Sequence, residues 1–299
     1  MEGKWRWVLV TAIAPVAWGS TYYVTSHFLP ADAPLWGAAF RALPAAVLLL
    51  AIARRLPRGA WWWKSAVIGV LNVGAFFVLV YLSGVLLPSS VASTVMALSP
   101  LVMLLLAWAL IAERPGLIAL VASGLGIAGV VAIVAGPVER VDPGGVACAV
   151  AAMLMSSLGF VLAKRWRSAD DLVASTGWQL AWGGLAVLVV AALVEGPPPA
   201  LDMASALGFL YLTLVATAIA YLAWLGGIGR LGVGAVGLIG LLNPVTGVAL
   251  GVALAGESIT WVQAGGIGLV VVAIVLGQLP GRRSETEPPW RDSNSRPSG

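Results

Sequence analysis

Arg41 is the residue whose type and position most directly suggest chemistry. It lies well inside a long apolar segment of the chain. Placing a cation in hydrocarbon costs at least about 2.5–3.5 kcal/mol, so the guanidinium needs a reason to be there. One interpretation is contact with an anionic group of a substrate, or a gating interaction. The other, slightly favoured here, is a structural arginine that binds carbonyls of neighbouring helices or extends to the interface.

Aromatic and polar side chains in other apolar segments are candidates to line a binding site. Aromatic walls with a few hydrogen-bonding groups suit an amphiphilic organic solute. With Arg41, the candidate binding residues are Trp18, Ser20, Tyr22, Asn72, Phe76, Tyr81, Tyr221 and Trp224. The alternative is ordinary packing or a belt of aromatic residues at a membrane interface, and the belt is preferred for Trp61–Trp63 beside Lys64.

Pro100 and Pro244 are candidates for shaping or moving the helices that carry them. A proline removes one helical hydrogen bond and opens the preceding turn. Ser99 and Asn243, immediately before the two prolines, could satisfy the backbone groups that are freed. The prolines therefore predict a pair of kinks that line a central cavity or hinge the bundle, although a static kink is common in membrane helices.

Other chemistry is poorly supported by the residues. The chain has one cysteine and one histidine, so an intrachain disulfide or a Cys/His metal site cannot form, and no cofactor is expected. Ser20 and His27 would lie about 10.5 Å apart along a helix, too far for a nucleophile and its base. Glu113 and Glu257 come at the ends of apolar segments, where a helix-end role is favoured over proton transfer. We therefore expect no enzyme; a channel or a non-transporting scaffold stays open as an alternative.

The elements that position these residues are apolar segments long enough to cross a membrane. The chain of 299 residues is 60% hydrophobic and 10% charged, with a mean hydropathy of +0.96. A soluble domain usually carries about 25% charged residues, and a membrane helix needs about 20 apolar residues. Ten such segments are predicted at 7–27, 34–53, 65–86, 90–111, 117–136, 144–164, 172–194, 204–226, 232–254 and 261–279. The polar segment 281–299 is predicted to be a disordered cytoplasmic tail.

The positive charges predict the orientation of these segments. With the N-terminus in the cytoplasm and ten spans, fifteen of the 17 lysines and arginines fall on the cytoplasmic side. Arg140 alone falls outside, and Arg41 lies within a span. This asymmetry predicts a multi-pass protein of a bacterial cytoplasmic (inner) membrane with both termini in the cytoplasm.

The segments divide into two similar halves. Pro100 aligns with Pro244 at an offset of 144 residues. Upstream, at a shorter offset of 138, Arg41 aligns with the neutral Gln179. Five spans in each half mean that the second half enters the membrane from the opposite side. The predicted fold class is therefore an all-α integral membrane protein with ten transmembrane helices in two inverted five-helix repeats, at 7–136 and 144–279.

The order and doubling of short motifs resemble the drug/metabolite transporter superfamily, EamA family. The motifs are Ala17-Trp18-Gly19-Ser20, Phe40-Arg41, Asn72 to Phe77 with Tyr81, and the blocks from Pro100 to Glu113 and from Pro244 to Glu257. The resemblance covers roughly residues 10–279. It implies a ten-helix bundle that exports small metabolites such as amino acids or drug-like compounds.

The expected partners follow from this class. They are a small-molecule substrate and membrane lipid, with no nucleic acid. Glycines crowd three of the predicted spans and let helices approach closely, within one bundle or between two copies of the chain, so a homodimer is a candidate.

Overall fold

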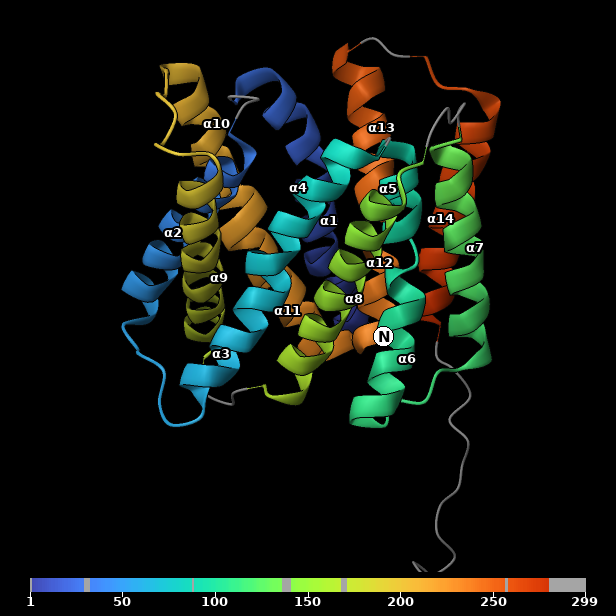
Figure 1. Ribbon diagram of the computed structural model, residues 1–299. Helices are drawn as coiled ribbons and strands as arrows, with labels where there is room; N and C mark the ends of the chain where they lie inside the picture. The colour runs from blue at the N-terminus through green and yellow to red at the C-terminus, as the bar shows by residue number, and fades with distance from the viewer. Residues whose placement is uncertain are drawn as a thin grey trace, which may run out of the picture.

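The computed structural model describes residues 2–29, 33–87, 89–135, 141–167, 171–255 and 258–279. Within these ranges the chain is helical, and the helices pack side by side with their ends at two opposite faces (Figure 1). The elements are α1 (Glu2–Phe28), α2 (Pro34–Ala53), α3 (Trp61–Gly69), η1 (Val70–Gly74), α4 (Ala75–Leu86), α5 (Ser89–Met96), α6 (Ser99–Ile111), α7 (Leu117–Ile133), α8 (Pro143–Arg165), α9 (Leu172–Val194), α10 (Met203–Thr213), η2 (Leu214–Ile219), α11 (Ala220–Leu231), α12 (Val233–Ile239), α13 (Leu242–Ala255) and α14 (Trp261–Gln278).

Length and composition make this a membrane bundle. Nine helical stretches of the described chain are long and apolar enough to cross a membrane. The remaining predicted span corresponds to α7, which has 17 residues and is about 26 Å long. The all-helical, multi-pass fold class is thus confirmed. The predicted tail, 281–299, lies outside the described residues.

Several helices begin where a polar side chain caps the first turn. The carboxylates of Asp142, Asp171 and Asp202 accept hydrogen bonds from backbone N–H groups of α8, α9 and α10 respectively. Thr260 and Gln263 form a reciprocal capping box at the start of α14. Such caps satisfy N–H groups that a helix leaves without an internal partner.

The two halves share irregularities at equivalent places. Among the described residues, η1 and η2 are π-helices that begin at Val70 and Leu214, which are 144 residues apart. Spans four and nine are each interrupted, between α5 and α6 and between α12 and α13, just before Pro100 and Pro244. The offset that aligns the prolines therefore also aligns the π-helices.

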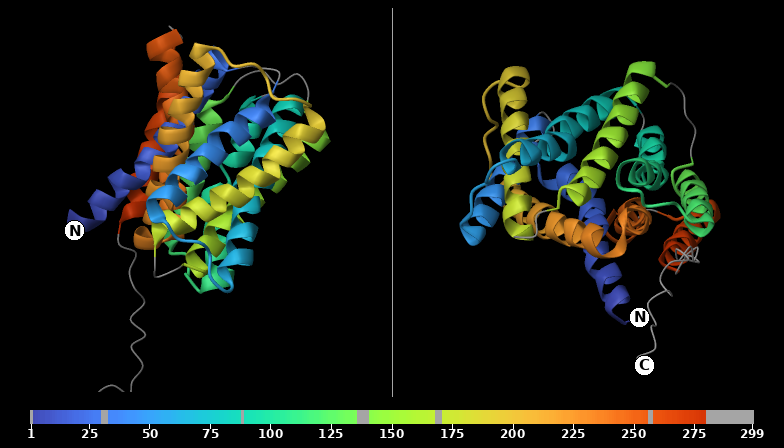
Figure 2. Two further views of the ribbon diagram at one scale, coloured as in Figure 1. Left: turned by 90° about the vertical axis from the view of Figure 1, so that its left-hand side faces the viewer. Right: turned by 90° about the horizontal axis from the view of Figure 1, so that it is seen from below.

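The halves interlock through two antiparallel helix pairs. Figure 2 shows α2 with α9 at one side of the bundle and α7 with α14 at the other. Trp36 of α2 donates its indole N–H to the carbonyl of Gly196 just past α9, at 3.1 Å. Trp178 of α9 donates to the carbonyl of Arg55 just past α2, at 2.8 Å. Each helix thus binds the chain beyond the end of its partner.

Close backbone contact between α7 and α14 depends on two glycines. A Cβ added at Gly129 would lie 2.8 Å from the carbonyl oxygen of Gly266, and one added at Gly266 would lie 2.6 Å from that of Gly129. Any other residue would push the helices apart. Gly124 and Gly265, by contrast, have nothing within 4 Å of an added Cβ.

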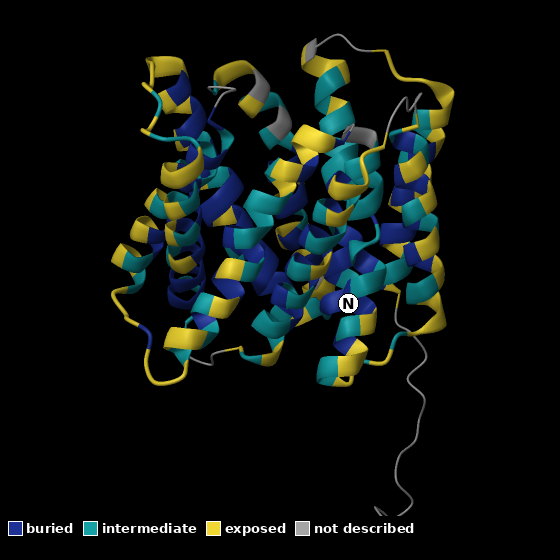
Figure 3. Cartoon of the chain, in the orientation of Figure 1, coloured by how far each residue is buried: buried dark blue, intermediate teal, exposed yellow. Residues whose placement is uncertain are grey.

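The outer surface of the bundle is apolar. Exposed residues cover the outward faces of the helices (Figure 3), and large hydrophobic side chains such as Val47, Trp108 and Leu193 are among them, at 54–81% exposure. Such a surface suits lipid contact. Lys and Arg gather at the helix ends that include the C-termini of α2, α6, α8 and α11, which we name the basic end.

Candidate functional site

Aromatic side chains from both halves meet in the interior of the bundle. The Trp18 ring of α1 lies 5.7 Å from the ring of Tyr221 and 5.2 Å from that of Trp224, both on α11. Phe160 of α8 lies 5.6 Å from Trp224. Tyr221 and Trp224 are 4% and 3% exposed. We name Trp18, Phe160, Tyr221 and Trp224 the aromatic centre.

Arg41 binds the backbone of η2 beside the aromatic centre. Its Nε donates to Thr217 Oγ1 and its Nη2 to the carbonyl of Ala216, both at 2.9 Å. The Trp18 indole N–H donates to the same carbonyl at 3.1 Å. The guanidinium also lies over the ring of Phe77, 5.3 Å from its centroid. These contacts support the structural interpretation of Arg41, because the described neighbours already take up several of its donors.

The first-half π-helix has an equivalent contact. Tyr221 Oη donates to the carbonyl of Asn72 in η1 at 3.1 Å. Asn72 and Ala216 are 144 residues apart, and so occupy equivalent positions in the two halves. A π-helix shifts the backbone bonding by one residue, and such bulges are frequent at functional sites. At this position in each half, a side chain donates to the backbone carbonyl.

Several buried polar groups beside this centre have no hydrogen-bond partner among the described residues. They are both amide atoms of Asn72 and the indole nitrogen of Trp224. The Asn72 side chain faces α8, because a Cβ added at Gly159 would lie 2.2 Å from its Oδ1. A buried donor or acceptor without a partner costs about 1–3 kcal/mol, so these atoms are suited to a polar ligand.

The structure brings five of the nine predicted binding residues together and leaves others apart. Trp18, Arg41, Asn72, Tyr221 and Trp224 form one connected group. The other predicted residues do not join it in the described contacts. Ser20 Oγ shares a hydrogen bond of 2.6 Å with Tyr211 Oη, Phe76 packs on Phe77, and Tyr81 packs against a buried cluster that includes Trp36 and Val187. The side chain of Tyr22 lies outside what the structure describes.

The predicted role of the residues before the prolines can be followed in the structure. Ser99 Oγ donates to the carbonyl of Met96 at 2.7 Å, the carbonyl that Pro100 leaves without its usual partner. Asn243 donates its backbone N–H to the carbonyl of Gly240 at 3.0 Å, which does the same before Pro244. The result is an interrupted helix in both halves, a larger change than the predicted kink. A Cβ added at Gly19 of α1 would lie 2.5 Å from the carbonyl oxygen of Asn243, so α1 packs directly against the interruption.

Some interacting residues were absent from the sequence prediction. Ala216 and Thr217 were missed because an alanine and a threonine in an apolar segment give no signal of a binding role. Phe160 and Phe77 could have been proposed as aromatic residues at similar depth. Glu113 was assigned to a helix end, and there its carboxylate pairs with Lys164 and accepts the backbone N–H of Val233. Its repeat equivalent, Glu257, lies outside the described residues.

Metal chemistry has no support in the part of the chain that the structure describes, where no group of three or more histidine, cysteine, aspartate or glutamate side chains could hold an ion. The interior of the described bundle instead offers aromatic faces, amide and indole groups and one guanidinium. These groups can bind an organic molecule by stacking and hydrogen bonding.

Comparison with known proteins gives a consistent result. Residues 5–135 and 143–277 each match the EamA-like transporter family. Protein PecM of Dickeya dadantii is 36% identical over 284 residues, which are 92% of this chain and 94% of that protein. The uncharacterized inner membrane transporter YedA of Escherichia coli is 29% identical over 271 residues, 87% of each chain. A solved crystal structure of 22% identity covers 94% of this chain and 99% of its own with a TM-score of 0.80, which shows the same fold.

Proposed function

The chain belongs to the EamA-like transporter family, and on this premise we propose that it is a secondary transporter that exports small organic metabolites by alternating access. The solutes we expect are amino acids and aromatic or drug-like compounds. The membrane is the bacterial cytoplasmic membrane, with the basic end and both termini in the cytoplasm. An enzymatic activity has no support in the family assignment.

The observation that carries this proposal is the aromatic centre with its unpartnered polar atoms. Trp18 comes from the first half, and Tyr221 and Trp224 come from the second. In transporters built from inverted repeats, the substrate site lies near the membrane midplane at the repeat interface. Asn72 and Trp224 would then supply the hydrogen bonds to the solute, and the rings of Trp18 and Tyr221 its apolar contacts.

The centre is packed closed in this conformation. Asn72, Tyr221 and Trp224 are 2–4% exposed, so a solute can reach them only after the halves move. The interrupted helices α5–α6 and α12–α13 and the two π-helices are elements where such a movement could occur. Pro100 and Pro244 would mark the hinges. The described spans carry no aspartate or glutamate at mid-depth, which favours a coupling mechanism without a buried acid.

Transport in reconstituted vesicles tests the proposal. Purified full-length protein would be inserted into vesicles, and the movement of labelled amino acids and aromatic metabolites would be measured in both directions. We expect at least one solute to move faster than in protein-free vesicles, and Trp224→Phe to reduce that movement. Inserted, folded protein that moves no member of the panel would contradict the proposal. A homodimer stays a prediction from the sequence, and the mass of the purified protein in detergent would test it.

A further inference from the structure

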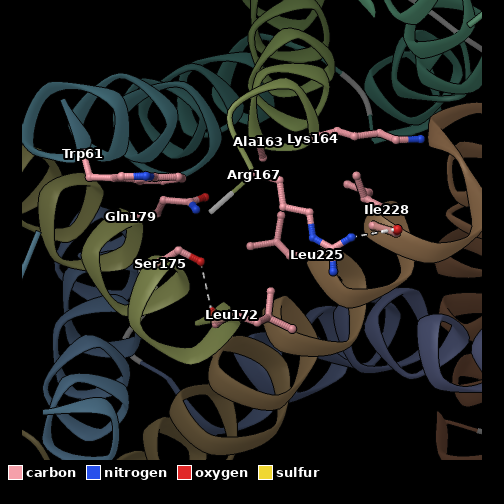
Figure 4. A pocket seen from close by; sticks show the side chains of 10 residues that line it. Trp61, Ala163, Lys164, Arg167, Leu172, Ser175, Gln179, Leu225 and Ile228 are labelled. Carbon is pink, nitrogen blue, oxygen red and sulfur yellow. Dashed lines mark hydrogen bonds between the residues drawn. The ribbon is translucent and has the colours of Figure 1, made fainter. Parts of the chain in front are cut away.

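A pocket opens at the basic end of the bundle, beyond the aromatic centre along α11. It lies between the end of α8, the start of α9, the end of α11 and the start of α3 (Figure 4). Its walls include Trp61, Arg167, Ser175, Gln179, Leu225 and Ile228. The enclosed space is only about 30 Å³ and opens to solvent, so the pocket is narrow. It could admit the polar end of a small molecule.

The cationic group at this pocket is Arg167. One of its guanidinium nitrogens, Nη1, donates to the carbonyl of Gly229 at 2.9 Å. That bond holds the side chain beside α11, and among the described residues the other donors of the planar group have no hydrogen-bond partner, so they can bind a ligand. Lys164 also lines the pocket, but its amine extends away from Gln179 and pairs with Glu113 (Figure 4). The positive charge available to a ligand therefore comes mainly from Arg167.

The second polar group is Gln179, which is 4% exposed. Its side-chain oxygen has no hydrogen-bond partner among the described residues. Figure 4 shows this side chain between the Trp61 ring and Arg167. A buried acceptor without a donor is unfavourable, and an N–H or O–H group of a ligand would satisfy it. Trp61, Leu225 and Ile228 supply apolar surface around these two polar groups.

We propose that this pocket is an access site at the basic end, and that it binds organic anions which carry a carboxylate next to an N–H or O–H donor. Arg167 binds the carboxylate, Gln179 accepts from the donor, and the apolar walls contact the carbon skeleton. The inference deepens the proposed function, on which it rests, by naming the charge of the solute. Leu225 follows Trp224 directly, and Gly229 lies about 12 Å along α11 from Tyr221, so the pocket and the aromatic centre share one helix.

The reactivity of a single cysteine at Ser175 tests the charge preference without any transport measurement. In a Cys148→Ser background, the Ser175→Cys thiol would be labelled by two ethyl methanethiosulfonates, one carrying a sulfonate and one a trimethylammonium group. The Arg167→Gln change should lower the anion-to-cation rate ratio by at least about three-fold, because a unit positive charge that lines the same pocket is removed. Arg165→Gln is the matched control: Arg165 is exposed at the same end and does not line the pocket, so the ratio should stay unchanged. If the thiol at this position reacts with neither reagent, Leu172→Cys on the same pocket wall gives the same measurement.

Ligand protection completes the test. The probe pair is mandelate, which has a carboxylate next to a hydroxyl, and benzylamine. Mandelate should slow labelling of the Ser175→Cys thiol and benzylamine should not, and both Arg167→Gln and Gln179→Leu should weaken the protection by mandelate. An unchanged rate ratio in Arg167→Gln, or equal protection by the two probes, would overturn the proposed site. Anion-selective protection in a protein that moves no solute would support the site and contradict the transporter proposal, so the two failures can be told apart.

Discussion

Trp18 and Arg41, from the first and second spans, donate hydrogen bonds to one backbone oxygen, the carbonyl of Ala216 in η2. The equivalent carbonyl in the first half, that of Asn72, accepts from Tyr221. Each half thus sends a side chain to the irregular turn of the other. These contacts connect the π-helices to the aromatic centre. A displacement of one half would therefore displace the backbone of the π-helix in the other half.

Replacing Arg41 tests whether the guanidinium is structural. Arg41→Gln removes hydrogen bonds to Thr217 and Ala216, and charged hydrogen bonds contribute about 1.5–3 kcal/mol each. We expect a lower midpoint of thermal unfolding in detergent, with Arg58→Gln as the exposed control that leaves the midpoint unchanged. Unaltered unfolding combined with lost transport would assign the guanidinium to the substrate instead.

Asn72→Leu separates a binding role from a structural one. The change removes two buried polar atoms that have no partner among the described residues, so stability should stay equal or rise by about 1–3 kcal/mol. Transport should nevertheless fall strongly, because the proposed bonds to the solute are lost. Ser157→Ala removes another unpartnered buried group of the described chain and should leave transport intact. A marked loss of stability in Asn72→Leu would argue that the amide holds the fold together.

We expect Glu113 to hold the first turn of α12 in place at the basic end. Its carboxylate pairs with Lys164 and accepts from the backbone N–H of Val233 at the start of α12. Partly exposed ion pairs contribute about 0–1 kcal/mol, so Glu113→Gln should have little effect on global stability. Hydrogen exchange at the first turn of α12 should nevertheless become several-fold faster. Slowed or unaltered exchange there would contradict this role.

Glu195→Gln is the matched control for that measurement. Glu195 accepts the backbone N–H groups of Leu35 and Trp36 at the opposite end of the bundle, both at 2.9 Å. Its replacement should accelerate exchange at the start of α2 and leave α12 unaffected.

The contact between α7 and α14 predicts a sharp difference between two glycines. Gly129→Ala would place a methyl group 2.8 Å from the carbonyl oxygen of Gly266 and should cost about 1–3 kcal/mol of stability. Gly124→Ala meets nothing within 4 Å and should be neutral, or stabilising by up to about 1 kcal/mol through helix propensity. Thermal unfolding of the two variants compares them directly, and equal midpoints would contradict the close approach.

Replacing Pro100 tests whether the interruption between α5 and α6 acts as a hinge. Pro100→Ala restores a backbone N–H at the interruption between α5 and α6, so we expect a more stable protein with several-fold slower transport. Pro44→Ala, inside the regular helix α2, is the control and should not slow transport. Transport at the original rate in Pro100→Ala would show that the interruption is a static feature.

The sequence predicts the spans more fully than the contacts between them. Uninterrupted apolar runs bounded by charges or prolines set helix positions to within a few residues; α2, for instance, begins and ends where it was expected, at Pro34 and Ala53. The π-helix at Val70–Gly74 could not be predicted, because its residues are as compatible with an α-helix. η1 packs against α8 and α9, and the sequence pattern alone does not reveal those contacts.

The residue types of the candidate site could be predicted from the sequence, but the hydrogen-bond partners of those residues could not. Trp18, Asn72 and Tyr221 could be proposed because aromatic and polar groups are unusual at that depth. Their bonds to carbonyls of Ala216 and Asn72 depend on a backbone oxygen, which every residue has and which no residue type identifies. For the same reason, the hydrogen-bond partners of Arg41 could not be predicted from the sequence.

The bonds of Arg41 also bear on how the protein is made. Its partners Ala216 and Thr217 follow it by 175 and 176 residues in the chain. At synthesis rates of about 5–20 residues per second, the ribosome needs roughly 10–35 s to produce them. During that interval the newly inserted second helix holds a guanidinium whose final acceptors do not yet exist. The hydrogen bonds of Arg41 to η2 can form only when the eighth span arrives, so the packing of α2 against the second half is completed late in synthesis.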